Sequence, residues 1–191
     1  MIKRQTIFQA DLFVKSDVGT SNQRDALLTR LNTEQTNVMY NSNPGCYRFD
    51  YIWDDLDWLL KEINLLLVEA VTFYSEKDRT FSKIPKGNNV KVKIWANINA
   101  IGSRNTFHTH KEDEFSGVYY VQSNDTGDLR FTNPANVLGD CSRTSPFTRD
   151  FSFVPRDGDL ILWPSWMPHE VEPNLSQQSR INLAFNIRIA S

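Results

Sequence analysis

All three histidines of the chain lie in two short motifs whose residue types and spacing suit a metal ion. His108 and His110 belong to the segment N-T-F-H-T-H, and His169 belongs to W-P-S-W-M-P-H-E-V. On an extended strand, residues i and i+2 point to the same side, so one strand can direct both neighbouring imidazoles at one ion. A third imidazole from a distant segment completes an open site with positions left for water, a cosubstrate or oxygen. The pattern therefore predicts a metal centre with His108, His110 and His169 as its ligands.

The third ligand has an alternative nearby in the sequence. Asp113, or one of its neighbours Glu112 and Glu114, can replace His110 if the chain bends locally after His108. The i+2 geometry favours His110 over these carboxylates. Imidazole suits iron, manganese and zinc alike, so the ligand types alone do not select the metal.

Hydrophobic periodicity predicts the elements that position these residues. Apolar residues recur at helical spacing from Asp54 to Glu76, which predicts a long helix lying on a sheet, and a shorter helix is expected around Arg24–Leu31. Period-two patterns between turn residues predict strands at Val90–Asn99, Gly117–Gln122, Asp128–Thr132, Asp150–Val154, Asp159–Trp163, Glu170–Glu172 and Ser179–Ile189. Helices followed by a series of short strands favour a mainly β fold, a sandwich or jelly roll backed by α-helices.

The last of these strands predicts where a cavity lies. Its apolar face consists of Ile181, Leu183, Phe185, Ile187 and Ile189. Its opposite face consists of Arg180, Asn182, Ala184, Asn186 and Arg188. We expect the apolar face to pack under the helices and the polar face to line a cavity, together with Trp95, Asn97 and Asn99 of the strand Val90–Asn99.

Composition excludes several classes of function. The net charge of −2 and the even spread of basic residues argue against a nucleic-acid partner. No apolar run has the length of a membrane span or a signal peptide, so no membrane partner is expected. Cys46 and Cys141 lack a metal-binding or disulfide pattern and are predicted to be free thiols of a cytoplasmic protein.

The length of 191 residues suits a single domain, residues 1–191. We expect a supporting N-terminal part of helices and loops over about 1–85 and a β core over about 88–190. The sequence does not define the oligomeric state.

An ordered series of motifs resembles the 2-oxoglutarate/Fe(II)-dependent dioxygenases, including their prolyl hydroxylase branch. After H-x-H come S-G-V-Y-Y-V (116–121), G-D-L-R-F-T-N-P (127–134), G-D-L-I-L-W-P-S-W-M-P-H-E-V (158–171) and R-I-N-L-A-F-N-I, which opens at Arg180. The resemblance extends over about Val90–Ile189. It implies a double-stranded β-helix, the jelly-roll fold that cupins share.

The resemblance also implies the cofactors and their ligands. Fe(II) would be held by the motif residues, with 2-oxoglutarate as cosubstrate and O2 as oxidant. Arg180 matches the family's arginine that meets the far carboxylate of 2-oxoglutarate, and Tyr120 matches an assisting tyrosine. Asn182 replaces a small hydroxyl residue of the family pattern, and Asn97 is a candidate hydrogen-bond partner of the cosubstrate on the same predicted face. No catalytic residue beyond the metal ligands is expected.

The predicted function is an oxygenase that couples decarboxylation of 2-oxoglutarate to succinate with hydroxylation of an unidentified substrate. One alternative is a cupin-type metalloenzyme with three histidine ligands that does not use 2-oxoglutarate. Another is a non-catalytic jelly-roll binding module.

The substrate is expected to be a small molecule or a peptide side chain. The loops Gly102–Asn105 and Val137–Arg149 are its expected contacts, because loops on a rigid scaffold carry specificity. Arg104, Arg130 and Trp166 are further candidates.

Overall fold

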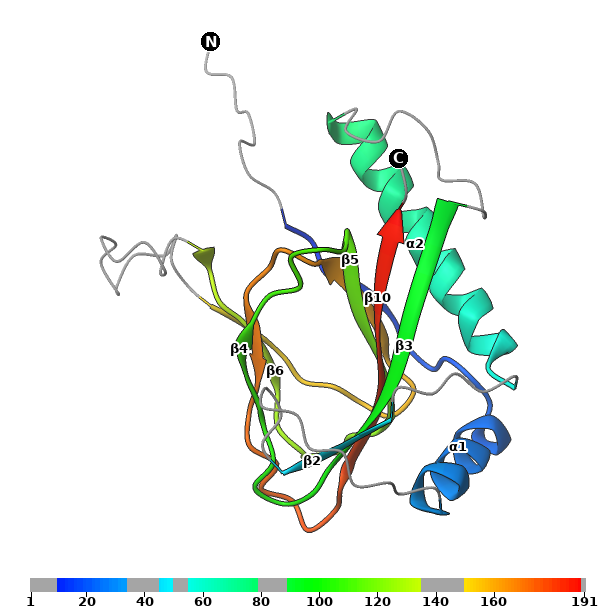
Figure 1. The fold of residues 1–191 in the computed structure, drawn as a ribbon, viewed down its shortest axis with the longest axis vertical. Helices are drawn as coiled ribbons and strands as arrows, with labels where there is room; N and C mark the ends of the chain where they lie inside the picture. The colour runs from blue at the N-terminus through cyan, green and yellow to red at the C-terminus, as the bar shows by residue number, and fades with distance from the viewer. Residues whose placement is uncertain (1–9, 34–44, 50–54, 79–88, 135–149, 190–191) are drawn as a thin grey trace.

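Two antiparallel sheets face each other in the computed structural model, which describes residues 10–33, 45–49, 55–78, 89–134 and 150–189 (Figure 1). The elements in chain order are β1 (Phe13–Lys15), α1 (Ser21–Thr33), β2 (Cys46–Phe49), α2 (Asp57–Asp78), β3 (Val90–Asn99), β4 (Asn105–His108), β5 (Phe115–Gln122), β6 (Leu129–Phe131), β7 (Phe151–Phe153), β8 (Leu160–Pro164), β9 (His169–Val171) and β10 (Arg180–Ile189). The six-stranded sheet has the order β1-β8-β5-β10-β3-β2, and the four-stranded sheet has the order β4-β9-β6-β7. This mainly β arrangement is the predicted double-stranded β-helix.

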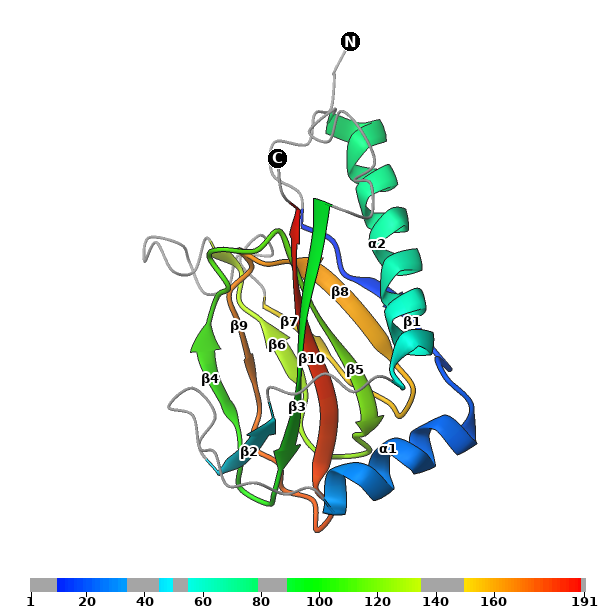
Figure 2. The same ribbon diagram turned by 45° about the vertical axis from the view of Figure 1, so that its right-hand side comes forward.

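Both helices lie outside the six-stranded sheet, on the side away from the four-stranded one (Figure 2). The apolar face of α2 packs on that sheet through buried residues such as Leu59, Ile63 and Val71. α1 begins at Ser21 because Thr20 and Gln23 cap it reciprocally. The Thr20 N–H donates to Gln23 Oε1 at 2.8 Å, and the Gln23 N–H donates to Thr20 Oγ1 at 3.3 Å. Both predicted helices are confirmed.

β10 occupies the centre of the six-stranded sheet and separates the core from the interior between the sheets. It pairs with β3 along its whole length and with β5 from Ile181 to Ile187. Ile181, Leu183, Phe185 and Ile187 join the same buried cluster as the helices. Arg180, Asn182, Ala184 and Asn186 line a cavity between the sheets. The predicted division of this strand into two faces is confirmed.

The sequence patterns missed three strands. β1 and β2 form the two edges of the six-stranded sheet, and β4 forms an edge of the four-stranded sheet. Each has only three or four residues. The region before residue 85 therefore contributes edge strands as well as helices. No helix among the described residues combines the length and the apolar character that a bilayer span requires.

Truncation of Leu59 tests the packing of α2. Leu59 is 0% exposed, whereas Leu65 on the same helix is 49% exposed. We expect Leu59→Ala to lower the free energy of unfolding by about 2–5 kcal/mol, because it leaves a cavity under the helix. The matched Leu65→Ala is expected to change it by no more than about 0.5 kcal/mol. Urea denaturation followed by circular dichroism measures both, and equal effects would contradict this packing.

Candidate functional site

The edge strand β4 of the four-stranded sheet and its neighbour β9 bring the histidines together. His108 at the end of β4 is the register partner of His169 at the start of β9. His110 lies just beyond the end of β4, where its N–H donates to Ser165 O at 3.0 Å. This backbone bond ties the segment after the strand to Ser165, and the ring of His110 lies 4.9 Å from that of His108.

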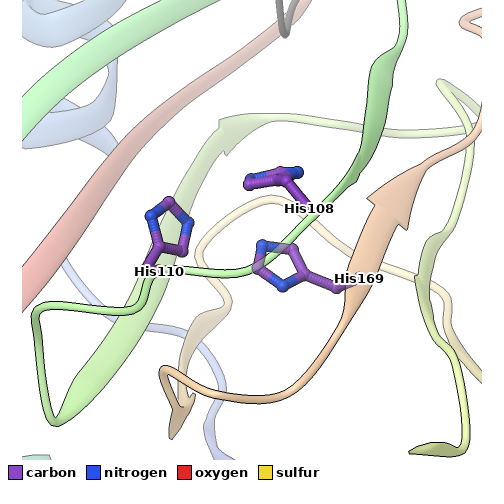
Figure 3. A group of neighbouring side chains, drawn as sticks. All are labelled: His108, His110 and His169. Atoms are coloured by element: carbon purple, nitrogen blue, oxygen red, sulfur yellow. The ribbon is translucent and has the colours of Figure 1, made fainter.

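The three imidazoles face one another (Figure 3). Their ring centroids lie 4.3 Å apart for His108 and His169, 4.9 Å for His108 and His110, and 5.3 Å for His110 and His169. One ring nitrogen of each lies within 4.8 Å of the others. Small rotations of the rings would bring these nitrogens to the ligand distances of about 2.0–2.1 Å that one shared ion requires.

Backbone carbonyls orient two of the rings. Nδ1 of His108 lies 2.6 Å from Thr106 O, and Nδ1 of His169 lies 2.9 Å from Met167 O. A carbonyl only accepts, so each Nδ1 carries the proton and each Nε2 keeps its lone pair. Metal-binding histidines in proteins are commonly held in this way.

His110 is oriented by a side chain instead. Asn186 Nδ2 lies 3.2 Å from His110 Nδ1 and donates to Asp113 Oδ2 at 2.9 Å. Asp113 also accepts from Arg188 Nε at 3.3 Å. The carboxylate weighed as an alternative ligand thus bonds to Asn186 and Arg188, and it lies outside the group of three converging histidines.

Burial keeps the imidazoles neutral. Desolvation lowers the pKa of His108. Desolvation and the neighbouring His108 lower the pKa of His110 to about 4 and that of His169 to about 3. Neutral imidazole is the form that binds a metal, so all three rings are ready to do so at neutral pH.

The histidines open onto the cavity between the sheets, and aligned positions of four adjacent strands form one of its walls. One row runs from Arg48 on β2 through Asn97 and Asn182 to Tyr120 on β5. All four residues line the cavity. The volume of about 90 Å³ is several times the roughly 10–15 Å³ that one water needs, so a small ligand fits.

Arg180 lies in the wall of this cavity with most of its donors unused. Its side chain is fully buried, and Nη1 donates to Thr126 O at 2.5 Å and to Glu172 O at 3.3 Å. Nε and Nη2 have no partner among the described residues. Burial lowers the pKa of the guanidinium, and the loss of its hydration is costly unless an anion or acceptor replaces the water.

The other predicted cosubstrate residues line the same cavity as Arg180 and the histidines. Asn97 Nδ2 donates to Asn182 Oδ1 at 2.9 Å, which fixes both amides in the wall. Tyr120 is buried beside Arg180, and desolvation raises the pKa of its hydroxyl, so it stays protonated and able to donate.

The predicted substrate contacts do not lie together around the histidines. Arg104 and Arg130 line a second hollow that none of the histidines borders, and Trp166 is half exposed. The loop 137–149 and Cys141 lie outside the described residues. Cys46 is buried as a free thiol.

Sequence reasoning missed Arg48. Its guanidinium carbon lies 4.4 Å above the centre of the Trp95 ring, on the cavity side of β2. The short segment C-Y-R-F carries no recognisable motif, so only the pairing of β2 with β3 reveals this position.

A family model described as "Putative 2OG-Fe(II) oxygenase" matches residues 93–186, about half of the chain. This span contains the three histidines and Arg180. No curated protein sequence matches the chain.

Solved structures of similar fold include a prolyl-4-hydroxylase from Pseudomonas putida, with a TM-score of 0.64 and 14% identity over 94% of this chain and 93% of that one. A Trichoplax adhaerens prolyl hydroxylase, in complex with a peptide fragment of hypoxia inducible factor, has a TM-score of 0.61 and 15% identity over 93% of this chain and 83% of that one. The α-ketoglutarate-dependent epimerase SnoN from nogalamycin biosynthesis has a TM-score of 0.66 and 11% identity over 94% and 79% of the two chains. At these identities the neighbours establish the fold. The match over residues 93–186 shows that the chain belongs to the family described as putative 2OG-Fe(II) oxygenases.

Proposed function

We propose that the protein is a 2-oxoglutarate- and Fe(II)-dependent dioxygenase that couples decarboxylation of 2-oxoglutarate to succinate with hydroxylation of a substrate. The main support for this proposal is the set of side chains that line the cavity. The cavity that receives three converging neutral imidazoles also contains a buried arginine with two unused donor nitrogens. A metal ion would bind the three imidazoles, and an acidic small molecule would bind the unused donors of the arginine.

The three histidines fit a divalent iron. Three neutral nitrogen ligands leave coordination positions on the cavity side for exchangeable ligands. The carbonyls of Thr106 and Met167 hold His108 and His169 in the required tautomer, and Asn186 contacts the third ring. These bonds reduce the reorganisation that metal binding would otherwise demand.

Arg180 fits the far carboxylate of the cosubstrate. Two unused nitrogens of a planar guanidinium match the two oxygens of a carboxylate. Tyr120, Asn97 and Asn182 line the wall beside it and offer further polar groups. When bound, the iron and 2-oxoglutarate supply the oxidising chemistry, while the chain orients the reactants and excludes water.

A third imidazole in place of a carboxylate leaves the metal centre more positive than a two-histidine, one-carboxylate site. Three-histidine iron also suits the cupin-type alternative, which uses no 2-oxoglutarate. The unused donors of Arg180 favour the oxygenase, because a metalloenzyme without an acidic cosubstrate gives this buried cation no partner.

The substrate is a small molecule or a peptide side chain. Similarly folded neighbours include a prolyl hydroxylase with a bound peptide fragment and an epimerase of nogalamycin biosynthesis. A cytoplasmic location follows only from the cysteine usage and remains a prediction.

Substitution of the ligands tests the metal centre. We expect His108→Ala, His110→Ala and His169→Ala each to weaken zinc binding at least about a hundredfold, measured by competition with a chromogenic chelator. Asp113→Asn is expected to weaken it less than the histidine substitutions do, by about tenfold, because Asp113 contacts the ring of His110 through Asn186. Thr109→Ala, between the two neighbouring ligands, serves as the control. A larger loss in Asp113→Asn than in His110→Ala would make the carboxylate the ligand.

Substitution of Arg180 tests the cosubstrate site. We expect Arg180→Gln to weaken 2-oxoglutarate binding to the zinc-loaded protein about a hundredfold with zinc still bound, because the bidentate partner is lost. Arg180→Lys keeps the charge in a single donor group and should lose less. Arg30→Gln on α1 is the control, and isothermal titration calorimetry measures all four proteins. Unchanged affinity in folded Arg180→Gln would contradict the assignment.

A further inference from the structure

We propose that the indole N–H of Trp163 binds the cosubstrate at the end opposite Arg180, by donating to a keto or carboxylate oxygen beside the metal ligands. This inference rests on the proposed function, because it adds a binding residue to the same cavity. β8, which carries Trp163, is a buried apolar segment, and its sequence alone assigns the indole no role beyond packing.

Trp163 faces the interior between the two sheets. Leu160 and Leu162 of β8 join the core under the helices, whereas Ile161 and Trp163 join the smaller cluster on the opposite face. Trp163 is 2% exposed and lines the cavity. Its ring lies edge-to-face against that of His169, with centroids 5.1 Å apart. Trp163 therefore belongs to the cavity wall next to one of the proposed metal ligands.

The indole N–H of Trp163 lacks an acceptor. Nε1 is buried and has no hydrogen-bond partner among the described residues. An indole nitrogen only donates, and a buried donor without an acceptor costs free energy that a phenylalanine at this position would not. Contacts with the rings of His169 and Phe131 account for the apolar part of the side chain. A ligand oxygen in the cavity would supply the acceptor.

The unused donors gather around one cavity, at two separate places. In the described part of the chain, the buried side-chain donor atoms without a partner are Nε1 of Trp163 and Nε and Nη2 of Arg180. Both residues line the cavity. Trp163 pairs in register with Ser116, and Ser116 pairs with Asn186, which contacts His110. Arg180 lies at the first position of β10, well before Asn186. Trp163 is thus at the end near the histidines.

A ligand with acceptor oxygens at both ends would use both sets of donors. 2-Oxoglutarate has a carboxylate at its far end, which Arg180 fits, and a keto acid at its near end. The keto and carboxylate oxygens of the near end only accept, which matches the donor-only indole of Trp163. An ammonium group in place of the keto oxygen would meet the N–H with a second donor. The contact therefore favours a keto acid over the corresponding amino acid.

The test follows the indole N–H directly, by 1H–15N NMR of the zinc-loaded full-length protein labelled at its five tryptophans. Trp→Phe variants assign the five signals, and elimination assigns Trp163 if Trp163→Phe does not fold. The ligands are 2-oxoglutarate and pyruvate, which keeps the keto-acid end and lacks the far carboxylate. We expect both to move the Trp163 proton signal downfield, because its N–H gains an oxygen acceptor. Trp58 on α2, outside the cavity, is the internal control.

A matched pair of substitutions measures what the hydrogen bond contributes. We expect Trp163→Phe to weaken 2-oxoglutarate binding to the zinc-loaded protein about tenfold and to keep zinc affinity, because one hydrogen bond to the cosubstrate is lost. Trp58→Phe makes the same change on the outer side of the six-stranded sheet and should leave both affinities unchanged. Isothermal titration calorimetry measures the three proteins.

The failures of the two proposals differ in these measurements. Binding of 2-oxoglutarate with no response of the Trp163 signal, or with an equal response of Trp58, would overturn the role of Trp163 and leave the proposed function intact. Unchanged affinity in folded Trp163→Phe would overturn it as well. No binding of 2-oxoglutarate to the unchanged protein would count against the proposed function, whereas a Trp163 response to pyruvate would still support the near-end contact. Absence of both responses would overturn both proposals.

Discussion

The pairing of β10 with β3 on one side and β5 on the other positions the residues of both the hydrophobic core and the cavity. A strand bonded on both sides has a fixed register, and that register decides which residues face each sheet surface. One face closes the hydrophobic core under α2. The other face presents Arg180, Asn182 and Asn186 to the cavity. A slip by a single residue would bury the polar face in the core and expose the apolar one, so folding and site formation depend on one register.

Backbone contacts also position the ligands of the proposed metal centre. β4 and β9 pair so that His108 and His169 face each other, and carbonyls two residues earlier orient both rings. His110 lies past the strand end and relies on Asn186 of β10. The contact between Asn186 and His110 therefore connects the two sheets at the cavity, and a bound metal ion would strengthen this connection.

Much of this architecture could be predicted because long periodic segments determine their own faces. The alternation in β3 and β10 predicts both the strands and the cavity wall, and the helical spacing predicts α2. β2 could not be predicted in the same way, since four residues do not define a period. Arg48 could not be predicted as a cavity residue for the same reason. The alignment of β2 with β3 depends on tertiary packing, as do the hydrogen bonds of the histidine rings. The metal ligands and the cosubstrate residues remain predictions that converge in space.

Iron and 2-oxoglutarate are proposed to occupy one cavity together. Anaerobic titration of the iron-loaded protein with 2-oxoglutarate, followed by visible absorption spectroscopy, detects both ligands in one measurement. A weak charge-transfer band that grows to saturation is expected, because a keto acid chelates ferrous iron through two oxygens. Absence of that band in protein shown to contain iron would rule out the shared cavity and favour a three-histidine metal site that does not use 2-oxoglutarate.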